Sequence, residues 1–125
     1  MKTPANPVTA ADAEKFEGYI AKWQPLLGLS AWRLLKGDKA ARGAMADISI
    51  SVPDRCAVYR LGAHFGSEAV NDFSLEQSAV HELLHIWPAY FRVLIESKCP
   101  DDVLMSAEHE FIHTLERLLV PPCKT

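Results

Sequence analysis

The amino-acid sequence predicts an α+β fold, in a single domain over residues 1–125. Three observations predict it. One segment with helical periodicity opens the chain, two or three more close it, and between them apolar and polar residues alternate as they do in strands. At 125 residues, of which 49% are hydrophobic, the chain can bury one modest core. We therefore expect an N-terminal helix, a small antiparallel-type sheet of two or three strands, and helices after it.

The first helix is predicted over residues 9–24, where large apolar residues recur at helical spacing and share one side. Pro25 follows, at a position where a helix commonly ends. Residues 1–8 are expected to be flexible. The residues of the apolar side are Phe16, Tyr19, Ile20 and Trp23.

The sheet is predicted from three short segments in the first half of the chain. Residues 31–36 can form a strand, and residues 46–52 alternate apolar and polar side chains, which is typical of a half-buried strand. In that second strand Asp47 is among the side chains expected to point outward. A turn at Pro53-Asp54 then leads to a strand over residues 56–61.

A second helix is expected to begin at Ser74, because Ser74 and Gln77 have the spacing of a capping box, and to continue to Trp87. Pro88 should kink or end it, with another helical segment over residues 89–96. Most of the circumference of this helix is apolar, so it should be buried with its one polar stripe facing a cleft or a partner. The residues of that stripe are Gln77, Ser78, His81, Glu82 and His85.

The polar stripe contains the chain's most informative motif, His81-Glu82-Leu83-Leu84-His85. Two imidazoles one helical turn apart can bind a zinc ion, and the glutamate between them can activate a water bound to that ion. The motif therefore predicts His81 and His85 as zinc ligands and Glu82 as a general base. The alternative is a pair of core histidines that bind no metal.

Catalytic zinc sites usually have three protein ligands. The metzincin arrangement is excluded, because Pro88 and Phe91 occupy its glycine and histidine positions. In a last helix over residues 101–120, Glu108 falls in the middle of an apolar stripe, where an ionised carboxylate is costly unless it is paired or binds metal. We therefore expect Glu108 to be the third ligand, with a salt bridge to a core Arg or Lys as the alternative and His109 as the reserve ligand.

Composition limits the partners that we expect. The net charge is −3 and no basic stripe is present, so neither nucleic acid nor an anionic membrane is an expected partner. The N-terminus lacks the apolar segment of a signal peptide and no run reaches transmembrane length, which favours a cytoplasmic protein. Cys56, Cys99 and Cys123 are odd in number and are expected to be free thiols. The oligomeric state is left open.

With this motif, the third Glu and this element order, the chain resembles the zincin-like metallopeptidases of the gluzincin type. It looks most like the small His-Glu-x-x-His proteins encoded by phages and prophages in bacteria. The likeness runs from Leu27-Gly-Leu-Ser-Ala-Trp32 through the strands to the motif and the helix of Glu108. It implies one Zn²⁺ per chain held by His81, His85 and Glu108, with Glu82 as general base. It also implies an extended peptide or protein substrate beside an edge strand, either residues 56–61 or their neighbour, residues 46–52.

The chain departs from the larger gluzincins at two points. Their third ligand precedes an Asp by four residues, and here that position is Ile112. They also use a Tyr or His from a further subdomain to hold the oxyanion, for which Tyr59, Tyr90, His109 and His113 are possible substitutes. The expected function is a zinc-dependent peptidase. The alternatives are a non-catalytic, zinc-stabilised binding or regulatory module of phage or prophage origin, and a metal-free fold with packed histidines.

Overall fold

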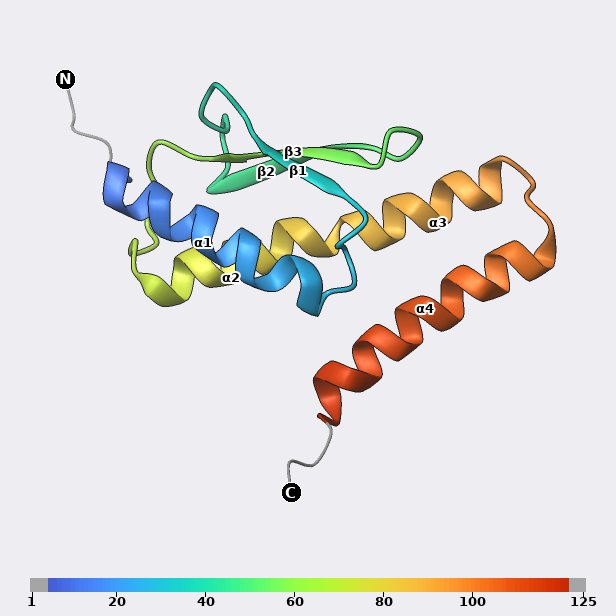
Figure 1. Cartoon of the computed structure of the whole chain (residues 1–125). Helices are drawn as coiled ribbons and strands as arrows, with labels where there is room; N and C mark the ends of the chain where they lie inside the picture. Colours follow the sequence, from blue (N-terminus) through green and yellow to red (C-terminus); the bar gives the residue numbers. More distant parts are fainter. Residues whose placement is uncertain (1–4, 122–125) are drawn as a thin grey trace.

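The structure, a computed structural model, describes residues 5–121, and these residues form an α+β fold as predicted. A helix comes first, a three-stranded sheet follows, and three helices close the described part of the chain (Figure 1). The elements are α1 (Ala10–Leu26), β1 (Arg33–Lys36), β2 (Ala46–Ser51), β3 (Cys56–Leu61), α2 (Asp72–Leu84), α3 (Ile86–Glu96) and α4 (Asp101–Leu119).

The sheet has the strand order β1-β3-β2, and it is mixed rather than purely antiparallel. The short connection between β2 and β3 makes a hairpin, so these two strands run antiparallel. β1 lies on the other side of β3 and runs parallel to it. Of the two strands proposed as the edge strand, β3 is therefore the central one, and β2 forms an edge of the sheet.

Helix α1 begins and ends close to the predicted limits. Thr9 caps it: the Thr9 hydroxyl accepts from the backbone N–H of Asp12, whose carboxylate accepts from the backbone N–H of Thr9. The helix continues past Pro25, and the chain turns at Gly28, which has a φ of +72°. A Cβ at Gly28 would lie 2.5 Å from Oγ1 of Thr114 on α4, so this glycine also permits the close approach of α4.

The N-cap of helix α2 lies three residues before the predicted one, because Asn71 caps the helix instead of Ser74. The Asn71 side chain accepts from the backbone N–H of Ser74, and the Ser74 hydroxyl accepts from the backbone N–H of Asn71. The helix ends at Leu84 rather than at Trp87. Since α3 begins at Ile86, Pro88 lies in its first turn, where a missing N–H breaks no helical hydrogen bond.

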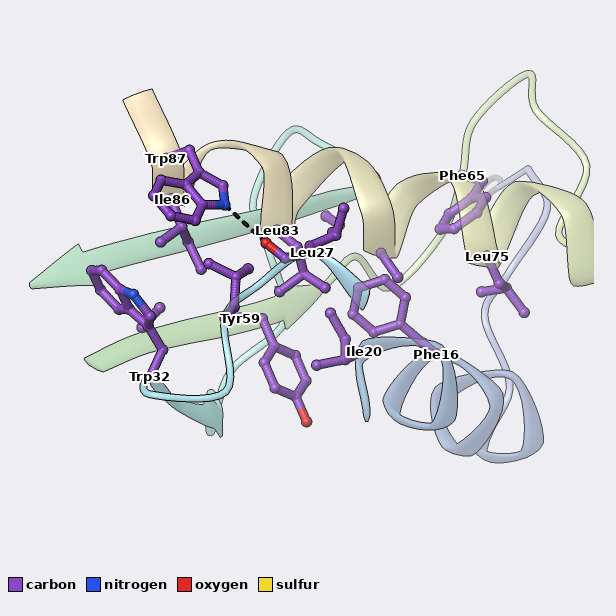
Figure 2. Packing of buried hydrophobic residues seen from close by; sticks show 14 residues of the cluster. Phe16, Ile20, Leu27, Trp32, Tyr59, Phe65, Leu75, Leu83, Ile86 and Trp87 are labelled. Carbon is purple, nitrogen blue, oxygen red and sulfur yellow. Dashed lines mark hydrogen bonds between the residues drawn. The ribbon is translucent and has the colours of Figure 1, made fainter. Parts of the chain in front are cut away.

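The core lies between the sheet and the pair of helices α1 and α2, which cover one face of the sheet (Figure 1). Figure 2 shows Phe16 and Ile20 of α1 beside Tyr59 of the sheet, with Leu75 and Leu83 of α2 in the same cluster. At the other end of the core, the indole N–H of Trp87 donates to the carbonyl of Leu27 at 2.9 Å. This buried hydrogen bond ties the start of α3 to the chain that follows α1.

Residues 6–8, which we expected in a flexible segment, pair with residues 63–66. The backbone N–H of Val8 donates to the carbonyl of Ala63, and the N–H of Phe65 donates to the carbonyl of Asn6. Cys56 and Cys99 are free thiols as predicted, whereas Cys123 lies outside the described residues. None of the helices in residues 5–121 combines the length and apolar character needed to cross a membrane.

Candidate functional site

The two histidines of the motif lie side by side at the C-terminal end of α2. His81 is in the last turn of the helix, and His85 is the single residue that separates α2 from α3. Their ring centroids are 5.1 Å apart with an angle of 74° between the ring planes, and both residues are exposed. The predicted alternative of two packed core histidines is therefore wrong, because both rings reach solvent.

Glu82 lies between the histidines in sequence but is far more buried, with 7% of its surface exposed. Burial raises the pKa of its carboxyl group, the nearby His81 and His85 lower that pKa, and the carboxylate of Asp47 raises it again. Desolvation is the largest of these effects, so the Glu82 carboxylate holds a proton more readily than an exposed glutamate does. This is the direction expected for a group that accepts a proton during catalysis.

Glu82 lines two cavities. The first, which we call the β2–α2 cavity, has a volume of about 480 Å³, and the second, the β2–α3 cavity, about 300 Å³. Both lie between the edge strand β2 and the helices. The β2–α2 cavity is lined by Ala44, Met45, Ala46, Gln77, Ser78, His81 and Glu82. The β2–α3 cavity is lined by Asp47, Ile48, Ile50, Glu82, His85, Pro88, Ala89 and Arg92.

Glu108 does not lie where the sequence led us to expect it. Its side chain is exposed, and the buried positions of α4 are Ala107 and Thr114. The residues of α4 that pack lie along one side of the apolar stripe, so Glu108 in the middle of the stripe lies outside the contact. Within residues 5–121, no three His, Cys, Asp or Glu side chains form a group that could hold a metal ion. The structure thus brings His81 and His85 together but does not bring Glu108 to them.

Asp47 is the acidic residue that the sequence analysis missed. It lines the β2–α3 cavity together with Glu82 and His85, and its charge affects the pKa of Glu82. Its carboxylate also accepts from the side chain of Arg60 at 2.6 Å. The alternation of residues 46–52 predicted only that Asp47 points outward. Its proximity to the motif depends on β2 being the strand next to α2, which no local pattern reveals.

None of the four residues considered for the oxyanion lines either cavity beside Glu82. Tyr59 packs in the core, with its ring centroid 5.9 Å from that of Phe16. Tyr90 lies beside Arg55, with the guanidinium carbon 4.9 Å from the ring centroid. His109 and His113 lie exposed on α4. The cationic residue that does line a cavity is Arg92.

No protein-family model, no curated protein sequence and no solved structure matches the chain.

Proposed function

We propose that this protein is a zinc-dependent peptidase whose active site is the face of α2 that carries His81, Glu82 and His85. One observation carries the proposal. A motif suited to zinc lies beside two cavities, its two imidazoles exposed and adjacent and its nearly buried glutamate lining both. The resemblance to small phage and prophage His-Glu-x-x-His proteins also supports it, and favours action in the cytoplasm of a bacterial host.

The donor chemistry of the two imidazoles fits a zinc ion. His81 and His85 supply two nitrogen donors from one helical turn, and both residues are exposed, so an ion has access to them. When bound, zinc polarises a carbonyl oxygen and lowers the pKa of a bound water. Glu108 remains our first candidate for a third ligand, although α4 would have to move to bring it to the pair. Asp47, already in the β2–α3 cavity, is the competing candidate.

Glu82 is the residue to which we assign proton transfer. Burial raises the pKa of its carboxyl group. The same side chain lines both cavities, so it is accessible to a water molecule and to a peptide bound beside it. It would take a proton from the attacking water and pass it to the leaving amine. β2 supplies the means to hold a substrate, because the backbone groups on its free edge can pair with an extended peptide.

The test is hydrolysis of a peptide mixture by the full chain with added zinc, followed by mass spectrometry. Glu82→Gln should keep its zinc and lose at least about a hundredfold in rate, the usual contribution of a general base. Glu96→Gln, at an exposed position of α3, is the matched control and should hydrolyse like the wild type. No hydrolysis by the wild type with bound zinc, or equal hydrolysis by Glu82→Gln, would overturn the proposal.

The second candidate function is a non-catalytic, zinc-stabilised binding or regulatory module. The exposure of Glu108 favours it, because two imidazoles without a third close ligand form an incomplete catalytic site. This candidate predicts that zinc raises the melting temperature while no peptide is cleaved. The zinc content and the hydrolysis assay together separate the two functions.

A further inference from the structure

Both cavities beside the motif are lined by Glu82 and by residues in or next to β2. β2 lies at the edge of the sheet, so one row of its backbone groups has no neighbouring strand among the described residues. The β2–α2 cavity opens along the N-terminal part of β2, and the β2–α3 cavity opens along the residues from Asp47 to Ile50. An extended chain added to this edge would therefore place one side chain in each cavity.

The two cavities differ in the charge of the lining residues that do not belong to the His81–His85 motif. Apart from His81 and Glu82, the β2–α2 cavity has only small, apolar or uncharged polar residues on its walls. Apart from Glu82 and His85 of the motif, the β2–α3 cavity combines the apolar residues Ile48 and Ile50 with two charged residues, Asp47 and Arg92. The carboxylate of Asp47 is paired with the guanidinium of Arg60. Arg92 forms no ion pair within residues 5–121, so its positive charge is available to a ligand.

We infer that the β2–α3 cavity binds a carboxylate of the peptide substrate through Arg92, while the β2–α2 cavity takes an uncharged side chain. This inference rests on the proposed function, since it assigns the substrate class of the same site. A glutamate side chain suits the cavity in both of its parts. Its methylene groups can lie on Ile48 and Ile50, and its carboxylate can accept the two parallel hydrogen bonds that a guanidinium donates.

The carboxylate could belong to an internal acidic residue or to the C-terminus of the peptide. Both sources present the same chemistry to Arg92, and the experiment has an arm for each. One series of fluorescein-labelled peptides, amidated at the C-terminus, carries a single internal Glu or, in its place, a single Gln or Lys. The other series has no acidic side chain and differs only in a free or an amidated C-terminus.

Binding is measured by fluorescence anisotropy on the full chain with zinc and the substitution Glu82→Gln, which prevents turnover. We expect roughly tenfold tighter binding for the carboxylate peptide than for its neutral partner, the size of a charged hydrogen-bonded contact. Adding Arg92→Glu should abolish that difference and favour the Lys peptide. Arg92→Lys should keep part of the preference. Arg33→Glu, which makes the same charge change at an exposed position on the opposite edge of the sheet, should leave the preference intact.

Each outcome decides the inference separately from the peptidase proposal. Equal binding of carboxylate and neutral peptides, a preference that survives Arg92→Glu, or no peptide binding overturns the role of Arg92. Cleavage by the wild type without any charge preference leaves the peptidase standing and removes only this inference. A carboxylate preference abolished by Arg92→Glu, in a wild-type chain that cleaves nothing, keeps the binding cavity and removes the peptidase.

Discussion

Helices α2 and α4 are held in the molecule in very different ways. α2 packs against both α1 and β2, and its inner residues Leu75, Ala79 and Leu83 are almost wholly buried. α4 packs along one side only, mainly against α3, and Figure 1 shows it diverging from the rest of the molecule. Its outer face leaves Met105, Ile112 and Leu119 exposed at 57%, 46% and 77%. The position of α2 is therefore fixed by the core, whereas that of α4 depends on few contacts.

The largest expected effect is a difference in how much truncation of a side chain on α2 or on α4 destabilises the protein. Leu83→Ala removes a fully buried side chain of α2 and should lower the free energy of unfolding by about 2–5 kcal/mol. Ile112→Ala truncates a half-exposed side chain of α4 and should cost less than about 1 kcal/mol. Urea denaturation followed by circular dichroism measures both. Equal losses would contradict the idea that α4 is only loosely held.

The second effect concerns zinc. His81→Ala and His85→Ala should each weaken zinc binding by more than about a hundredfold, since loss of a ligand exceeds the usual loss of a supporting residue. Competition with a chromogenic chelator gives the affinity. Glu108→Ala and Asp47→Ala, compared in the same assay, identify the third ligand.

If neither of these two acidic substitutions changes the zinc affinity, His81 and His85 are the only two of these four residues that bind the ion. Glu116→Ala is the control, because this exposed residue of α4 lies beside His113 and lines neither cavity at the motif.

The third effect tests how closely α4 approaches the turn after α1. Gly28→Ala forces a left-handed backbone on alanine and places a Cβ against Oγ1 of Thr114, so we expect a loss of about 1–3 kcal/mol. Adding Thr114→Ala should recover part of that loss by removing the steric overlap. A double-mutant cycle from thermal melts gives the coupling. Full additivity would show that α4 does not rest on this turn.

The smallest effect at neutral pH is expected at Tyr59. Burial, and to a lesser degree the charge of Glu17, raises the pKa of its hydroxyl above 10.0. The unfolded chain then loses this proton first, so stability is complete below the unfolded pKa and falls as the pH rises through the folded one. Tyr59→Phe should match the wild type near pH 7 and lose less stability in alkaline melts. An identical alkaline loss would assign it to other groups.

Local patterns in the sequence carried most of the fold. The strand over residues 56–61 has the predicted limits, and the helices are close to theirs, because helical and strand periodicity reflect burial within one element. The predicted N-cap of α2 was wrong by three residues, since Asn71 and Ser74 form the same kind of capping box as Ser74 and Gln77 could. The parallel pairing of β1 was missed, because it depends on the path of the chain around β2.

In the candidate site, too, local relations were predicted correctly and relations between elements were not. Residues one helical turn apart must share a face, so the adjacency of His81 and His85 followed from spacing alone. Glu108 lies on a different helix from the two histidines. A helical projection shows which residues share a face of one helix, but it does not show which other element that face contacts. The exposure of Glu108 shows that the apolar stripe of α4 is wider than its contact. Asp47 reaches the site only through the order of the strands, which is likewise a property of the whole fold.

His85, which separates α2 from α3, also takes part in the first turn of α3 through its backbone. Its carbonyl accepts the backbone N–H of Ala89 at 3.3 Å, so this residue of the β2–α3 cavity also anchors the first turn of α3. The helical wall of the β2–α3 cavity begins directly after His85 and consists of Pro88, Ala89 and Arg92. A shift of the backbone at His85 would therefore move the imidazole and the helical wall of this cavity together.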